Sequence, residues 1–341
     1  MELNGIRFMI NWRPCLALIF VMSSALAQES HFTEREVRFR NGSVELVGTL
    51  ITPQTQESQP AIVFLHGSGP ATRAGARPYA QEFAKLGIAS LFFDKRGSGA
   101  STGNWTRSSL EDLAHDALAA VEFLKQNANI DTSRIGLWGV SQAAWVATLA
   151  ASRSDDIAFM ILISGGGASP RESELYSYRT AFKTAGLSEA ESADGMRVIG
   201  QYFRYLDSGE ERAELVAELE KSKDKPWYKY APLERILPSN ENRINWSWVA
   251  TWGPSPHIER ISCPILLMFG DKDVNQPTEL AVKKWREGLA KAENKNVTLM
   301  IFPGAGHGIR VGEHSHKAPF ADGYAEVMLG WLWKHVVIED R

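Results

Sequence analysis

The stretch Gly136–Trp145, GLWGVSQAAW, joins two different patterns at a single serine. Just before the turn, Ile135–Trp138 is a short apolar run of the kind that forms a buried β-strand. The residues after Ser141 are small and apolar, and they suit a helix packed on a sheet. We therefore expect a strand, a sharp turn and a helix, which together form the repeating unit of an α/β fold.

Similar apolar runs lie on both sides of this stretch. Most of them are separated by helical patterns, and they are typical of the buried strands of a parallel sheet. The clearest helix is expected to begin at a capping box of Ser108 and Glu111 and to carry apolar residues on one face as far as Leu124. The alternation predicts an α/β fold with a mostly parallel sheet and helices on both faces. The runs are 61–65, 88–93, 135–138, 158–163, 265–269 and 297–302.

Two segments depart from this alternation. Residues 36–51 alternate around Asn41-Gly42 and predict an antiparallel hairpin ahead of the parallel strands. Residues 164–257 are rich in helix formers and then in aromatics, which predicts a helical cap inserted over the carboxyl edge of the sheet, where α/β proteins bind ligands. A packing subdomain without substrate contacts is the alternative. The predicted core domain then comprises residues 28–163 and 258–341.

Residues 1–27 have the three regions of an export signal. Arg7 and Arg13 precede the apolar run Cys15–Met22, and the small residues Ala25 and Ala27 suit cleavage after Ala27. The run is shorter than the roughly 20 apolar residues that span a bilayer. We expect a secreted or periplasmic protein without stable membrane association, with an uncleaved anchor as the alternative.

The composition narrows the classes of partner. The chain has 341 residues, 44% of them hydrophobic and 23% charged, and a formal net charge of −3, without a basic run that would favour nucleic acid. We expect a small-molecule partner.

The cysteine and the histidine pair carry no predicted site. Signal cleavage leaves Cys263 without a disulfide partner, and we expect a buried and inert thiol. His314 and His316 lack a convincing third ligand, which favours a solvated loop over a metal site.

Ser141 is the candidate nucleophile. From Gly139 to Ala143 the pattern is G-x-S-x-A, close to the nucleophile elbow, in which a strained turn exposes the serine hydroxyl. Gly139 lets the chain bend tightly, while Ala143 adds one methyl where glycine is usual. An ordinary helix N-cap serine is the alternative.

Two later loops offer the partners that a serine nucleophile needs. A serine hydroxyl requires a base, and the base requires a group that orients it. His307 lies in the small-residue loop PGAGHG after the run 297–302 and is the candidate base. In the loop GDKDVN after the run 265–269, Asp273 is the candidate orienting acid. Asp271 is the second choice, with a structural role in the turn as its alternative.

Acyl transfer also needs backbone N–H donors for the developing oxyanion. One candidate is Gln142, which follows the nucleophile at the start of a helix. The second is Ser68 in the early loop LHGSGP, residues 65–70, with Gly69 in reserve. This loop lacks the pattern of a phosphate-binding loop.

With Ser141, Asp273 and His307 in this order, the chain resembles the α/β-hydrolase superfamily. The loop Phe92–Ser101, FFDKRGSGAS, is similar to loops of members related to serine aminopeptidases, prolyl oligopeptidase and dienelactone hydrolases. In such members the residues equivalent to Asp94 and Arg96 brace loops near the oxyanion site. The resemblance implies the same structural role for these two residues here.

The resemblance also implies the chemistry. Serine in place of aspartate at the elbow argues against dehalogenase and epoxide-hydrolase reactions. We expect an exported serine hydrolase that cleaves small or medium carboxylic esters through an acyl-serine and needs no cofactor. The alternatives are a serine aminopeptidase-like enzyme acting on short peptides and a non-catalytic binding protein of the same fold.

Overall fold

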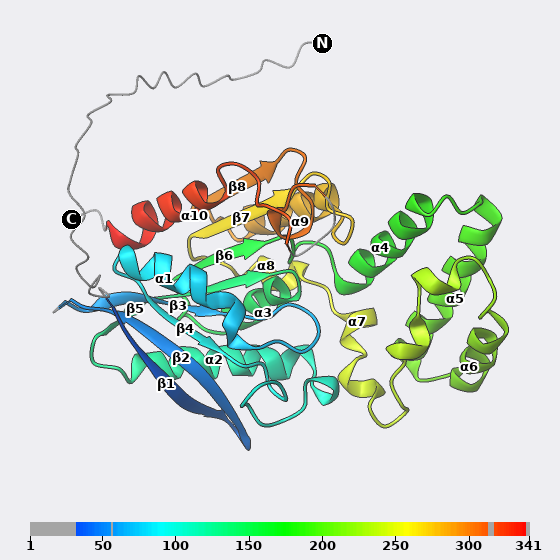
Figure 1. Ribbon diagram of the computed structural model, residues 1–341, viewed down its shortest axis with the longest axis horizontal. Coiled ribbons are helices and arrows are strands. Elements are labelled where there is room, and N and C mark those ends of the chain that lie inside the picture. The colour runs from blue at the N-terminus through cyan, green and yellow to red at the C-terminus, as the bar shows by residue number, and fades with distance from the viewer. Residues whose placement is uncertain (1–31, 56, 313–316, 339–341) are drawn as a thin grey trace, which may run out of the picture. The chain divides into compact units, whose positions relative to one another are not determined.

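Eight strands form one sheet within residues 32–55, 57–312 and 317–338, the part of the chain that the computed structural model describes (Figure 1). The strand order is β1-β2-β4-β3-β5-β6-β7-β8. The predicted export signal and the pair His314 and His316 lie outside the described residues. The strands are β1 (Phe32–Asn41), β2 (Val44–Pro53), β3 (Gln59–Phe64), β4 (Ala89–Phe93), β5 (Ile130–Val140), β6 (Phe159–Ile163), β7 (Ile265–Gly270) and β8 (Val297–Phe302).

The directions of the strands confirm the predicted mostly parallel sheet. β1 and β2 form the predicted hairpin, in which Asn41 pairs with Val44 and Gly42 turns the chain at a φ of 57°. β2 is antiparallel to β4, and all other neighbours are parallel. Because β5, β7 and β8 are parallel, the loops that follow them meet at one edge of the sheet.

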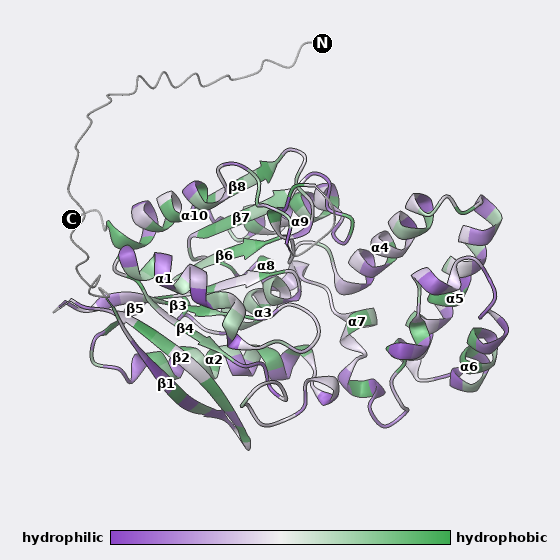
Figure 2. Ribbon diagram, in the orientation of Figure 1, coloured by the Kyte–Doolittle hydropathy of each residue, from purple (hydrophilic) through white to green (hydrophobic). Residues whose placement is uncertain are grey.

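Helices cover both faces of the sheet, as predicted. Side chains alternate along each strand, so that Val63 and Leu137 face one apolar layer while Ile62 and Trp138 face the other. The central strands β6 and β7 are hydrophobic along their length (Figure 2). The first layer is covered by α2 (Leu110–Lys125), α3 (Gln142–Ala151), α8 (Ser255–Ile258) and α9 (Thr278–Lys291), and the second by α1 (Arg77–Lys85) and α10 (Tyr324–Leu332).

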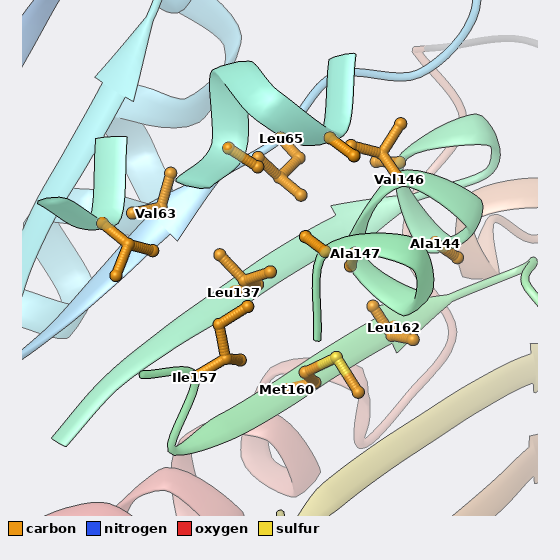
Figure 3. Packing of buried hydrophobic residues seen from close by; sticks show 14 of the residues in the cluster. Val63, Leu65, Leu137, Ala144, Val146, Ala147, Ile157, Met160 and Leu162 are labelled. Carbon is orange, nitrogen blue, oxygen red and sulfur yellow. The ribbon is translucent and has the colours of Figure 1, made fainter. Parts of the chain in front are cut away.

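Helix α3 presents small residues to the sheet. Ala143, Ala144 and Ala147 are fully buried. Figure 3 shows Ala144 and Ala147 facing Leu137 and Leu162 of the neighbouring strands. This packing fixes the start of α3, and with it the turn that carries Ser141.

The cap of helix α2 differs by one residue from the prediction. Ser109 and Asp112 form the capping box, in place of Ser108 and Glu111. The Ser108 hydroxyl is already used, because it donates to the Asn104 carbonyl at 2.8 Å and accepts from Arg96. The apolar face of the helix is buried as expected.

Between β6 and β7 the chain is helical, which confirms a helical cap insertion. It contains α4 (Pro170–Thr184), α5 (Glu189–Ser208), α6 (Arg212–Lys221) and the short α7 (Trp248–Thr251), grouped to one side of the sheet in Figure 1. This segment has a small core of its own, centred on Trp227. Three hydrogen bonds tie it to the loop after β7. The Tyr176 hydroxyl donates to the Asp273 carbonyl at 3.0 Å, the Ser173 hydroxyl to Gln276 Oε1 at 2.8 Å, and the Ser177 hydroxyl to Asn275 Oδ1 at 3.4 Å.

Short helical turns complete the chain. Over the described ranges, no helix has the length and apolar character needed to cross a membrane. Cys263 carries a partly buried free thiol, and desolvation raises its pKa to about 12, so it is inert as predicted. The turns are Arg73–Ala76, Trp105–Arg107, Tyr228–Tyr230, Leu233–Arg235, Arg243–Asn245 and His307–Ile309, with a π-helical turn at Trp333–Val337.

Candidate active site

Ser141 occupies a strained turn between β5 and α3. Its φ is 61° and its ψ is −124°, a conformation that costs a non-glycine residue free energy. Its N–H donates to the Ile163 carbonyl at 2.9 Å, which holds the turn against β6. Within the described residues, its hydroxyl caps no helix N–H. The alternative of a side-chain N-cap is therefore wrong, and the strained turn that the G-x-S-x-A pattern predicts is present.

Glycines on both sides let the turn pack tightly. A Cβ added to Gly139 would lie 2.5 Å from the Ala143 Cβ, so the alanine methyl fits because its neighbour has no side chain. A Cβ added to Gly165 would lie 2.6 Å from the Ser141 carbonyl oxygen. The departure from G-x-S-x-G is thus accommodated by Gly139.

His307 and Asp273 lie in contact at the same edge of the sheet. His307 Nδ1 is 2.9 Å from Asp273 Oδ2, and the Asp273 side chain is buried. The other oxygen, Oδ1, accepts the N–H groups of Asn275 and Gln276 at 2.8 and 3.0 Å. An ionised carboxylate only accepts hydrogen bonds, so Nδ1 carries the imidazole proton and Nε2 can accept another.

Asp271 has a different role. Its Oδ1 accepts the N–H of Gly304, and its side chain is partly exposed. This contact braces the turn after β7 against the turn after β8. The structure thus places Asp273, and not Asp271, against His307.

Ser141 and His307 line one cavity of about 680 Å³, which we call the first cavity. Among the described residues, no hydrogen bond joins their side chains, a separation that is common before substrate is bound. The loop of His307 is held by Ser164, whose hydroxyl accepts the N–H of Gly308 at 3.0 Å. Ser164 follows β6 and has a positive φ of 51°. Sequence reasoning missed this residue.

Ser68 and Gln142, the candidate oxyanion donors, lie near Ser141. Ser68 lines the first cavity, and the neighbouring Gly67 lies so close that an added Cβ would be 4.0 Å from the Ser141 Cβ. In the part of the chain that the structure describes, the N–H groups of Ser68, Gly69 and Gln142 have no protein acceptor. They are available to an oxyanion. Gly69 stays a second choice because its amide is equally unpaired.

Lys95 connects the loop of Gly67 and Gly69 to Gln142 at the start of α3. These two segments carry the candidate oxyanion donors, and we call them the donor region. The Lys95 ammonium is buried and donates to the carbonyls of Gly67 and Gly69 at 2.9 and 3.0 Å and to Gln142 Oε1 at 3.0 Å. Desolvation lowers its pKa to about 8, although the nearby Asp116 favours the charged form. This lysine lies within the stretch FFDKRGSGAS, and no local sequence pattern indicates its role.

Asp94 and Arg96, the two neighbours of Lys95 in the sequence, brace loops near the donor region, as the family resemblance implies. Asp94 accepts the N–H of Arg73 through Oδ1 at 2.8 Å and that of Ala100 through Oδ2 at 2.9 Å. Arg96 forms a buried bidentate pair with Asp116 at 2.6 and 2.7 Å. Across the described ranges, no group of three or more His, Cys, Asp or Glu side chains is arranged to hold a metal ion.

A comparison with known protein families assigns this chain to one of them. The family model for X-Pro dipeptidyl-peptidase (S15 family) matches residues 41–307, more than half of the chain. The chain belongs to the X-Pro dipeptidyl-peptidase (S15) family. This family assignment and the fold confirm the α/β-hydrolase superfamily that the motifs indicated.

The relatives of this S15-family chain include a quorum-quenching protein and an esterase. It is 31% identical to the quorum-quenching protein AidA of Acinetobacter baumannii over 31% of this chain and 35% of that protein. It is 24% identical to esterase EstD of Thermotoga maritima over 83% of this chain and 61% of the esterase. The chain thus spans less than two thirds of either relative.

A solved structure agrees in fold. An esterase of Pyrococcus furiosus superimposes with a TM-score of 0.57 and 19% identity, over 93% of this chain and 98% of the esterase. This S15-family protein is therefore a member of the α/β-hydrolase superfamily and has the fold of that superfamily.

Proposed function

We propose that the protein is an exported serine hydrolase that cleaves carboxylic esters through an acyl-serine. Ser141 is the nucleophile, His307 the base, and Asp273 the residue that orients the imidazole. The N–H groups of Ser68 and Gln142 hold the oxyanion. The observation that carries the proposal is the 2.9 Å contact between His307 Nδ1 and buried Asp273, at the cavity that the strained Ser141 lines.

The proposed reaction has two halves. Ser141 Oγ bonds to the ester carbonyl carbon while its proton passes to His307 Nε2 and the carbonyl π electrons move onto oxygen. The carbonyl then re-forms, the bond to the alcohol breaks, and His307 gives the proton to the departing alkoxide. Water repeats the sequence on the acyl-serine and releases the acid. Asp273 keeps the imidazole tautomer suited to both halves.

Peptide hydrolysis is the second candidate, favoured by the family model. A peptidase that recognises a free N-terminus needs a carboxylate near the scissile bond. Glu174 of α4 lines the first cavity and could serve this purpose. Parallel assays of short-chain aryl esters and aminoacyl amides separate the two activities. Faster Ser141-dependent release of amines than of ester alcohols would replace the esterase proposal with the peptidase.

An active-site phosphonate probe tests the proposed nucleophile. We expect one covalent adduct per chain on the wild-type protein and none on Ser141→Ala, located by mass spectrometry. A folded wild-type protein that stays unlabelled would favour a non-catalytic binding protein. The same labelling on separated cell fractions tests export, with the labelled protein expected outside the cytoplasm and lacking residues 1–27.

The pH dependence should report Lys95. Above a pH of about 8 its ammonium loses a proton, so the amine has two N–H groups for three acceptors and the donor region loosens. We expect kcat to fall above that pH with the pH dependence of a single deprotonation. Lys95→Met should lower kcat about 100-fold, the usual effect of losing one oxyanion interaction, and should remove this alkaline step.

Lys95→Arg serves as the control because its charge persists at alkaline pH. It should retain more activity than Lys95→Met and also lack the step near pH 8. An unchanged alkaline step in both variants, with normal melting curves, would rule out this role for Lys95.

A further inference from the structure

A second cavity, of about 500 Å³, lies beside the first. Its walls are largely aromatic and aliphatic and include Trp105, Trp145, Trp246 and Leu237. The indole N–H of Trp145 donates to the Ala168 carbonyl at 2.8 Å, and that of Trp246 donates to the Thr106 carbonyl at 2.7 Å. With these polar atoms satisfied, both indole rings present apolar surface. The second cavity therefore suits an apolar group.

The cavity adjoins the proposed oxyanion donors but not the proposed base. Ser68 and Gln142 line it, whereas His307 lines only the first cavity. In the tetrahedral intermediate of the proposed reaction, the oxyanion faces the donors and the leaving alcohol faces the imidazole. The remaining substituent on that carbon is the acyl chain. It extends away from His307, which is the direction of the second cavity.

Three residues line both cavities and mark where they meet: Ser68, Trp145 and Glu174. Within the described chain, the Glu174 carboxylate has no hydrogen bond or ion pair. The side chain is exposed, because it faces the space of the two cavities, and partial desolvation by the surrounding protein raises its pKa. When Glu174 is ionised, a second carboxylate brought beside it would be repelled.

We propose, resting on the esterase function above, that the second cavity binds the acyl group of the substrate and that Glu174 disfavours anionic acyl groups. The substrate class is then esters with a large, apolar acyl group that bears no carboxylate. Two cations also border this cavity, Lys95 and Arg235. The Lys95 ammonium is already bound by three oxygen acceptors, and Arg235 is exposed, so that solvent screens its charge. Both therefore offer little compensation to an anionic chain beside Glu174.

Acyl size is tested with 4-nitrophenyl acetate and octanoate. We expect the wild-type kcat/KM to be at least about tenfold higher for octanoate, since each methylene placed in an apolar pocket adds discrimination. Ile236 lines the second cavity and is 47% exposed, so Ile236→Asp can be made without disturbing the core. This variant should lower the octanoate to acetate ratio about tenfold.

Ile244→Asp is the matched control. Ile244 lies in the same helical segment, is 65% exposed and borders neither cavity, so the ratio should stay at the wild-type value. An equal loss in both variants, or a wild-type preference for acetate, would overturn the assignment of the acyl site.

Charge is tested with two esters of matched chain length, 4-nitrophenyl pentanoate and the 4-nitrophenyl monoester of glutaric acid. The wild type should prefer pentanoate by more than about tenfold, and Glu174→Gln should narrow this preference about tenfold. Glu214→Gln removes an exposed carboxylate of α6 that borders neither cavity and should change nothing. An unchanged preference in Glu174→Gln would remove Glu174 from the proposal.

These outcomes are distinct from failure of the proposed function. If the acyl site is wrong, acetate is still hydrolysed in a Ser141-dependent manner, without the expected dependence on acyl size and charge. If the proposed function is wrong, none of the esters shows Ser141-dependent hydrolysis.

Discussion

Replacing Ser141 by alanine should lower kcat for ester hydrolysis by about 10⁶-fold while the protein stays folded. The alanine lacks the oxygen that forms the acyl intermediate, so the imidazole and the oxyanion donors have no covalent step to assist. The residual rate, measured with 4-nitrophenyl acetate at high enzyme concentration, should exceed that of water alone. Its source is the remaining oxyanion interaction.

Ser141→Gly separates chemistry from strain. Glycine adopts a φ of 61° without the steric cost that serine bears, so this variant should be inactive yet more stable than the wild type by roughly 1 kcal/mol. Ser141→Ala keeps the Cβ and should gain nothing comparable. Urea unfolding measures both variants. Activity within tenfold of wild type in either one would exclude Ser141 as the nucleophile.

Asp273→Asn should lower kcat about 10⁴-fold, because it forces the wrong imidazole tautomer. The N–H groups of Asn275 and Gln276 point at Oδ1 and need an oxygen acceptor there. The new amide must therefore turn its NH₂ toward His307 Nδ1. That nitrogen would then accept a hydrogen bond, so the ring proton would move to Nε2, which could no longer take a proton from Ser141.

Asp271→Asn is the control for this prediction. Asp271 lies two residues away, and its contact with the Gly304 N–H needs only an oxygen, which asparagine keeps. We expect kcat to remain within about twofold of wild type. Equal losses in the two variants would mean that the substitutions disturb the loop and not the imidazole.

Much of the fold could be predicted because its signals are local. A run such as 158–163 is apolar at every position, and its short length is typical of a strand that is covered on both faces. The turn at Ser141 was predictable for the same reason, since the residues that shape it are its neighbours. The cap of α2 was misplaced by one residue because two adjacent serines precede two adjacent acids, and only the tertiary contact with Arg96 decides between them.

The residues that sequence reasoning missed act through distant contacts. Ser164 supports the loop of His307 from 144 positions away, and Lys95 reaches the N-terminus of α3 from 47 positions away. Neither carries a local pattern that distinguishes it from other serines and lysines. The aromatics of the helical segment were ambiguous for a related reason. Trp227 is buried in the small core of that segment, whereas Trp246 also borders the second cavity, and composition alone does not separate these positions.

The hydrogen bond from Tyr176 to the Asp273 carbonyl limits how freely this protein can be recombined. Transplanting the helical segment of another hydrolase onto this sheet would alter substrate access. It would also remove a support of the loop that carries Asp273. A chimaera that retains the first turns of α4 keeps that support. Laboratory recombination of such segments should therefore join the parental sequences after this tyrosine and not at the end of β6.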